Sequence, residues 1–131
     1  MTKRIATLIL VLALAVGVGA RPASGAEQKA RTIEGTLVDT KCYFADPANK
    51  GNDHGPMKAC GTACAKSGLP VGILTADGKH YGLVVPSPSV ADYVGQTVRA
   101  SGSVREGSLV PTKLEVKTAT GWQEVKLGAT M

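Results

Sequence analysis

Short stretches of alternating apolar and polar residues, separated by glycine-rich turns, most constrain the fold of this chain. Such alternation places every second side chain on one face and is typical of β-strands with one buried face. The strands that we expect are residues 31–39, 71–75, 80–85, 96–104, 109–117 and, more weakly, 122–127. An Asp-Gly turn joins the second and third of them into a predicted hairpin. Several short strands at this spacing predict a small antiparallel barrel or sandwich.

The order of the elements favours an OB-like barrel. Between the third and fourth strands lies a proline-rich break, followed by residues 90–94, for which we expect one short helical turn. One helical element at this place in a five-stranded, glycine-punctuated antiparallel chain is the order of the OB fold. Gly35, inside the first strand, indicates a bulge or a bend at a barrel corner. We therefore predict a mainly β protein, a five- to six-stranded antiparallel OB-like barrel, with a small β-sandwich as the alternative.

Residues 1–26 have the pattern of a secretory signal peptide. A basic pair precedes an apolar run over residues 5–20, and small residues at 23–26 suit a signal peptidase. The run is shorter than the roughly 20 residues of a membrane-spanning helix, and two glycines dilute its second half. We expect cleavage to leave a single periplasmic or secreted domain over residues 27–131, without a stable membrane anchor.

Signal cleavage would remove most of the net positive charge. The full chain has 15 basic and 10 acidic residues, a formal net charge of +5. Lys3, Arg4 and Arg21 lie in the signal, so the mature domain would keep 12 basic residues against 10 acidic ones. The remaining charges are interspersed and aromatic residues are few, a composition that argues against nucleic acid as a partner. The expected partner is a protein or a small ligand.

Residues 40–70 interrupt the strand pattern and contain every cysteine of the chain. Cys42, Cys60 and Cys64 lie in this insertion together with His54, one of the two histidines. Outside the cytoplasm, paired cysteines tend to form disulfides. With three cysteines, either one thiol stays free after a disulfide has formed, or the thiols are bound by something other than one another. The insertion is therefore the candidate functional site.

Local signals predict a loop and then a helix within the insertion. Residues 40–53 lack periodicity and contain turn formers, which indicates a loop. Residues 56–67 predict a short helix, because the proline at its start needs no intrahelical partner and the glycine after it is a good stop. On this helix Met57, Cys60 and Cys64 lie three or four residues apart and would share a face.

Aromatic residues flank the predicted site. Tyr43 and Phe44 follow Cys42 directly, and we expect them to pin the insertion to the barrel. His80 lies in the predicted hairpin, where we expect a solvated strand residue rather than a ligand.

One interpretation makes all four candidate residues ligands of a metal ion. Cys42, His54, Cys60 and Cys64 form a Cys3His set, which is a known closed tetrahedral zinc site. The spacing of four on a helix lets two thiolates converge on one ion without strain. The same residues, with Met57 nearby, would suit cuprous copper, which favours soft sulfur ligands. The predicted cofactor is zinc or copper.

A second interpretation is a structural disulfide. A bridge from Cys42 to Cys60 or Cys64 would close a loop of about 18–22 residues and contribute about 3 kcal/mol in the chain-entropy model. A bridge between Cys60 and Cys64 is disfavoured, because residues four apart on a helix hold their Cβ atoms about 5–6 Å apart and a disulfide needs about 3.5–4.5 Å. Thiol redox chemistry is a third interpretation, against which the lack of a C-x-x-C motif counts. The sequence favours a binding module over an enzyme and leaves metal and disulfide open.

Two segments carry a resemblance to a bacterial domain family. They are residues 37–42, LVDTKC, and residues 60–72, CGTACAKSGLPVG. The chain resembles a group of small exported, largely uncharacterised bacterial domains with a V-D-x-K-C opening, a C-x3-C-A-x-x-G-x-P segment and an OB-like set of strands. The resemblance implies the pairing of these cysteines with this scaffold, and it implies no reaction.

Overall fold

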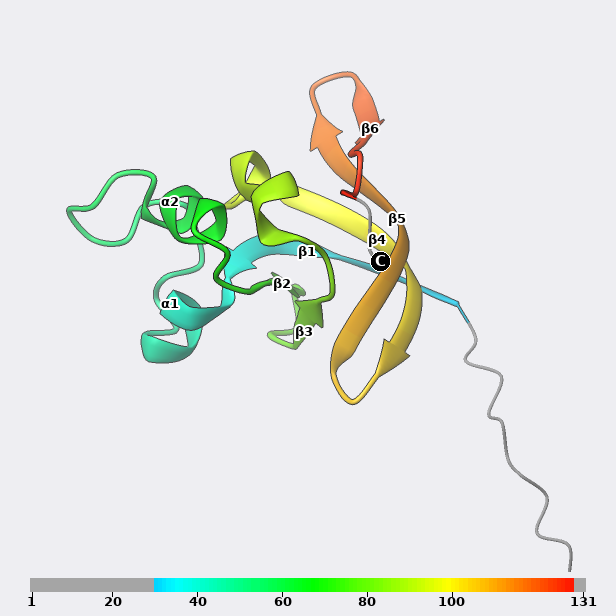
Figure 1. Ribbon diagram of the computed structural model, residues 1–131, viewed down its shortest axis with the longest axis horizontal. Helices are drawn as coiled ribbons and strands as arrows, with labels where there is room; N and C mark the ends of the chain where they lie inside the picture. The colour runs from blue at the N-terminus through cyan, green and yellow to red at the C-terminus, as the bar shows by residue number, and fades with distance from the viewer. Residues whose placement is uncertain (1–29, 129–131) are drawn as a thin grey trace, which may run out of the picture.

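The computed structural model describes residues 30–128, and the predicted signal peptide lies outside this range. The described part has six strands: β1 Arg31–Asp39, β2 Val71–Leu74, β3 His80–Leu83, β4 Thr97–Arg105, β5 Ser108–Thr118 and β6 Gly121–Glu124. Short helical elements connect them (Figure 1): α1 Thr40–Ala45, α2 Cys60–Lys66, and the 3-10 turns η1 Ser87–Ser89 and η2 Ala91–Tyr93. No helix within residues 30–128 is long and apolar enough to cross a membrane.

Five strands close into a barrel. The pairs β1–β2, β2–β3, β1–β4 and β4–β5 are antiparallel, and β3 pairs with β5 to close the sheet on itself. The strand β6 extends the sheet beyond β5 and stands away from the barrel in Figure 1. The predicted OB-like barrel is confirmed. It is mixed rather than purely antiparallel, since the closing pair β3–β5 is parallel.

The strand β1 bends at Gly35 and serves two partners. Its first part pairs with β4 from Arg31 to Thr36, and its second part pairs with β2 from Thr36 to Asp39. A Cβ atom on Gly35 would lie 2.2 Å from the carbonyl oxygen of Leu74. Only glycine allows this close approach, so the predicted bend at a barrel corner is confirmed.

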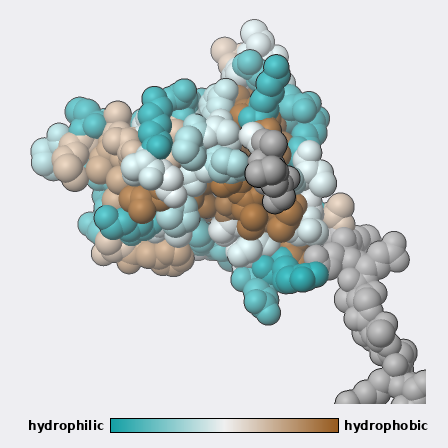
Figure 2. Space-filling view, in the orientation of Figure 1, coloured by the Kyte–Doolittle hydropathy of each residue, from teal (hydrophilic) through white to brown (hydrophobic). Residues whose placement is uncertain are grey.

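Apolar side chains from the strands and from the helical elements fill one core. Alternate residues of β4 point inward, as period-2 patterning requires. The buried core residues are Leu37, Ala65, Val71, Ile73, Leu83, Val90, Ala91, Val94, Val98, Ala100, Leu109, Leu114, Val116 and Val125. On the face in Figure 2, hydrophobic residues gather over the middle of the barrel, and hydrophilic side chains lie around it.

The helix α1 occupies the first part of the loop predicted for residues 40–53, and residues 46–53 contain no helix or strand, as predicted. The carboxylate of Asp39 caps it, since Oδ1 accepts hydrogen bonds from the backbone N–H groups of Lys41 at 3.0 Å and Cys42 at 3.4 Å. Such a cap satisfies backbone donors that have no intrahelical partner. The chain therefore turns directly from β1 into α1, and Cys42 lies in the first turn of the helix.

The helix α2 begins at Cys60, later than predicted. Before it, His54 and Met57 exchange backbone hydrogen bonds of 3.0 and 3.1 Å across a tight turn, in which Gly55 has a φ of +57°. Pro56 lies in this turn rather than at the start of a helix. Met57 is outside α2 and 58% exposed, so the predicted shared face holds for Cys60 and Cys64 alone.

Contacts with η2 hold α2 against one end of the barrel. The hydroxyl of Thr62 donates to the carbonyl of Ala91 at 3.1 Å. A Cβ atom on Gly61 would lie 2.6 Å from a methyl group of Val94, the residue that follows η2. This side chain therefore packs directly on the backbone of α2. These contacts fix the position of α2 relative to the sheet.

Candidate metal centre

Three cysteine side chains meet where α1 and α2 approach each other. Cys42 comes from α1, and Cys60 and Cys64 lie one turn apart on α2. Their sulfur atoms lie within 4.8 Å of one another, and each residue is partly buried. All three are free thiols in the described structure. We call this group the thiol triad, and it brings together the three cysteines that the metal interpretation requires.

His54 belongs to a second group of donors. One of its ring nitrogens, the sulfur of Cys42 and a carboxylate oxygen of Asp39 lie within 4.8 Å of one another. We call this group the mixed triad, and Cys42 is the residue that it shares with the thiol triad. The four predicted ligands are thus arranged as two overlapping groups rather than as one Cys3His cluster. Sequence reasoning missed Asp39, although its position as an Asp directly between a strand and a cysteine-bearing helix is an N-cap signal.

Two polar atoms of the mixed triad are buried without a partner. Asp39 is fully buried and His54 is only 5% exposed. The Oδ2 atom of Asp39 and the Nδ1 atom of His54 have no hydrogen-bond partner within residues 30–128. The Nε2 atom of His54 lies 3.2 Å from the carbonyl oxygen of Gly51. Because a carbonyl oxygen only accepts, Nε2 carries the proton and Nδ1 presents a lone pair.

The surroundings of Cys42 and Cys64 favour the protonated form of these two thiols when no cation is bound. Burial, and then the neighbouring Asp39 carboxylate, raise the pKa of Cys64 to about 12. The same two causes raise the pKa of Cys42. Neutral thiols are poor nucleophiles, so this environment disfavours nucleophilic attack by Cys42 and Cys64. A bound metal ion would reverse the preference, because its positive charge stabilises thiolates.

The loop before α2 fixes the start of this helix. The carboxylate of Asp53 accepts a hydrogen bond from the N–H of Ala59 at 2.7 Å. The backbone carbonyl of Asn52 accepts from the N–H of Gly61 at 2.9 Å, and its side-chain oxygen accepts from the N–H of Thr62 at 2.8 Å. The residue at the N-cap makes no side-chain cap bond, so these loop residues supply acceptors that the helix start needs.

Aromatic contacts fix α1 on the hairpin of β2 and β3. The ring of Tyr43 stacks on His80 with centroids 5.8 Å apart, and the ring of Phe44 meets His80 edge-on at 4.8 Å. These contacts confirm that the two aromatic residues pin the insertion to the barrel. His80 is partly buried rather than solvated, and burial lowers its pKa. It therefore acts as an anchor for α1.

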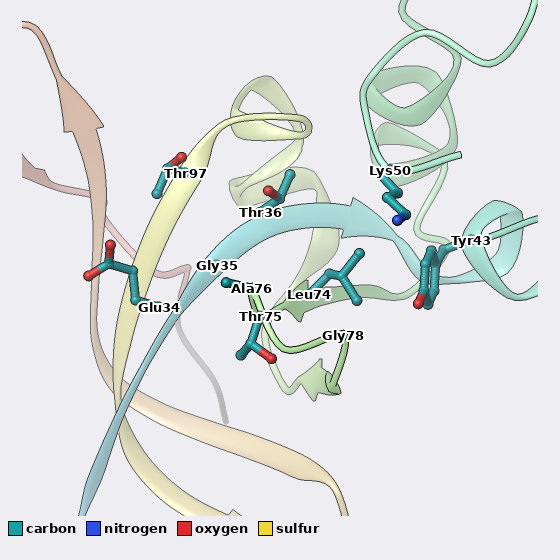
Figure 3. A pocket seen from close by; sticks show the side chains of 10 residues that line it. All are labelled: Glu34, Gly35, Thr36, Tyr43, Lys50, Leu74, Thr75, Ala76, Gly78 and Thr97. Carbon is teal, nitrogen blue, oxygen red and sulfur yellow. The ribbon is translucent and has the colours of Figure 1, made fainter. Parts of the chain in front are cut away.

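A groove of about 570 Å³ runs along β1 beside the insertion (Figure 3). Tyr43 and Lys50 line it from the insertion, and Glu34 and Thr97 line its opposite end. The remaining lining residues are Gly35, Thr36, Leu74, Thr75, Ala76 and Gly78. No residue of either triad lines it in the described part of the chain. Hydroxyl groups and side chains of opposite charge line this groove, so it can bind a small polar ligand by hydrogen bonds, at a place away from both triads.

Comparison of the chain with protein-family models, with curated proteins and with solved structures finds no match. Because a fold of this kind serves many functions, function must be inferred from the chemistry of the site.

Proposed function

We propose that this protein is an exported binding module that holds a soft or borderline metal ion, zinc or copper, at the thiol triad. The observation that carries the proposal is the convergence of three free thiols from two helices within 4.8 Å. Soft thiolate ligands select cuprous copper and also suit zinc. The predicted fourth ligand, His54, adjoins the triad at Cys42, so the three thiols are the minimal site.

The scaffold supports an ion-binding role. Cys42 is fixed by the capped start of α1, and Cys60 and Cys64 lie on a helix that is packed against the barrel. A metal site on rigid elements loses little conformational entropy when the ion binds. Each of the three sulfur atoms is partly buried, which shields a bound ion from competing ligands.

Export is part of the proposal and is supported by the signal pattern of residues 1–26. In an oxidising compartment, neighbouring free thiols are prone to form disulfides. A bound ion would keep the three sulfur atoms as thiolate ligands and leave none of them over. We therefore expect the metal-bound form to be the form that persists after export.

Native mass spectrometry of the mature protein, purified without chelator or reductant, tests the proposal. We expect a mass that exceeds the metal-free value by one metal ion, less the thiol protons that the ion displaces. No further loss of two hydrogens, which would indicate a disulfide, is expected. Serine in place of Cys42, Cys60 or Cys64 should abolish stoichiometric binding after reconstitution with cuprous copper. The variant Met57→Leu is the matched control, because this exposed residue lies outside both triads.

A different mass would overturn the proposal. A chain two hydrogens lighter than the fully reduced form and free of metal would show a disulfide, and the insertion would then be a stapled structural element. Retention of stoichiometric cuprous copper in any one cysteine variant would remove that residue from the ligand set of the thiol triad.

A further inference from the structure

The mixed triad contains two acceptors that its neighbours in the fold do not satisfy. Neither Oδ2 of Asp39 nor Nδ1 of His54 has a partner, and both residues are more than nine-tenths buried. Leaving a buried acceptor unpaired destabilises the fold, and the cost is larger for a charged group. Since a carboxylate oxygen and an imidazole lone pair have no proton to give, these two atoms cannot satisfy each other.

A bound cation would satisfy all three members of this group at once. The third member, the sulfur of Cys42, lies within 4.8 Å of a ring nitrogen of His54 and of a carboxylate oxygen of Asp39. The group therefore brings one carboxylate oxygen, one imidazole nitrogen and one sulfur within reach of a single ion. Zinc accepts all three donor types, whereas cuprous copper favours sulfur.

We propose that Asp39, Cys42 and His54 form a second metal position, for a borderline divalent cation of the zinc type. This position overlaps the thiol triad at Cys42 and uses neither Cys60 nor Cys64. It goes beyond the proposed function because it gives the centre a mixed oxygen, nitrogen and sulfur site with its own ion preference. The thiol triad remains the position for a soft ion.

Hydrogen bonds with neighbouring backbone groups hold two members of the mixed triad in place, Asp39 and His54, as is common for metal ligands. The Oδ1 atom of Asp39 is bound by the N–H groups of Lys41 and Cys42, which fixes where Oδ2 lies. The Nε2–H of His54 is bound to the carbonyl of Gly51, which fixes the tautomer with a free Nδ1. A ligating histidine commonly donates its other N–H to a carbonyl in this way.

Two single variants separate the positions. Asn caps helices as well as Asp does, so Asp39→Asn should keep α1 while it removes the anionic oxygen. We expect this variant to bind zinc at least about tenfold more weakly. Its affinity for cuprous copper should not fall, because the carboxylate that disfavours the thiolates of Cys42 and Cys64 is removed. Cys60→Ser should have the opposite effect, and Cys42→Ser should weaken both ions. Competition of each ion alone against a chromophoric chelator gives the affinities.

Each outcome decides between the two sites. Unchanged zinc affinity in Asp39→Asn, or an equal loss of zinc affinity in Cys60→Ser, would place zinc at the thiol triad and overturn the second position. Wild-type affinity for cuprous copper in all cysteine variants would instead overturn the thiol site, while the zinc measurements still test the mixed triad. If Asp39→Asn has an altered far-UV circular dichroism spectrum, His54→Gln replaces it with the same expectations.

Discussion

At the scale of single residues, Asp39 connects the fold to the candidate site through its two carboxylate oxygens. One oxygen caps α1, and the other lies buried and unpaired beside Cys42 and His54. Ser or Thr would also cap a helix, but neither has a second side-chain oxygen. Asp at this fully buried N-cap therefore supplies both the cap of α1 and a second oxygen next to the candidate site.

The barrel needs glycine at position 35, because the backbone of a neighbouring strand leaves no room there for a Cβ atom. In Gly35→Ala, the added Cβ would clash with the backbone of Leu74, 2.2 Å away, and the barrel corner would have to open. We expect the free energy of unfolding to fall by about 1–3 kcal/mol, the usual cost of overpacking. Urea denaturation followed by tryptophan fluorescence of Trp122 measures it. Gly51→Ala is the control, since no heavy atom lies within 4 Å of its Cβ position. Equal stability of the two variants would contradict this account.

At the scale of elements, the two short helices were the least predictable part of the chain. Helices of six and seven residues have little stability of their own, so their ends are set by contacts from elsewhere. The helix α1 depends on the cap from Asp39 and on the packing of its aromatic residues against His80. Pro56 suits a helix start, but the Gly55 turn placed it in a loop instead. Local pattern therefore located the insertion and the end of α2, and it missed α1 and the start of α2.

Asn52 supports the start of α2 and thereby the position of Cys60. Its side-chain oxygen accepts a hydrogen bond from the N–H of Thr62 at 2.8 Å and lies 3.0 Å from the Thr62 hydroxyl, whose single proton it shares with the carbonyl of Ala91. Loss of such a cap typically costs about 1 kcal/mol, and we expect Asn52→Ala to lose about 1–2 kcal/mol of stability. Because the first turn would loosen, its affinity for cuprous copper should also fall. Asn52→Asp keeps the accepting oxygen and should restore both properties in thermal melts and chelator competition. Weak binding in both variants would mean that the cap does not position Cys60.

An ion pair between β4 and β5 gives the barrel a defined response to acid. The guanidinium of Arg99 holds Glu115 by two hydrogen bonds of 2.7 and 3.1 Å, and this lowers the pKa of Glu115 to about 2. A carboxylate whose pKa is lower in the folded state stabilises the fold above its unfolded pKa, near 4.5, and this stabilisation is lost as the pH falls toward 2. We expect Glu115→Gln to lower Tm at pH 7, with the difference from wild type shrinking between pH 4.5 and 2. Calorimetry at several pH values measures it, and a difference independent of pH would contradict the assignment.

At the scale of the whole molecule, the strands and their closure into a barrel were predictable from sequence, and the parallel pair that closes the barrel was not. Alternation and turn signals are local, so β1 and the hairpin of β2 and β3 follow directly from sequence. The parallel pairing of β3 with β5 joins strands far apart in the chain, and no local pattern specifies it. The same limit applies to the site. The cysteines cluster in sequence, whereas the grouping of His54 with Cys42 and Asp39, apart from Cys60 and Cys64, depends on tertiary packing.

The candidate centre links the barrel to its insertion, so ion binding should stabilise the entire domain. Its donors come from the end of β1, from α1, from the following loop and from α2, which is packed on η2. This arrangement exists only in the folded chain, and a ligand that binds only that state adds about 2.7 kcal/mol at a free concentration 100 times its Kd. For a domain of this size, saturation with zinc or cuprous copper should raise Tm on the order of 10–20 °C. Differential scanning fluorimetry before and after addition of a chelator measures the change. Cys42→Ser, which lacks the residue common to both triads, should show no increase, and an equal increase in this variant would locate the binding elsewhere.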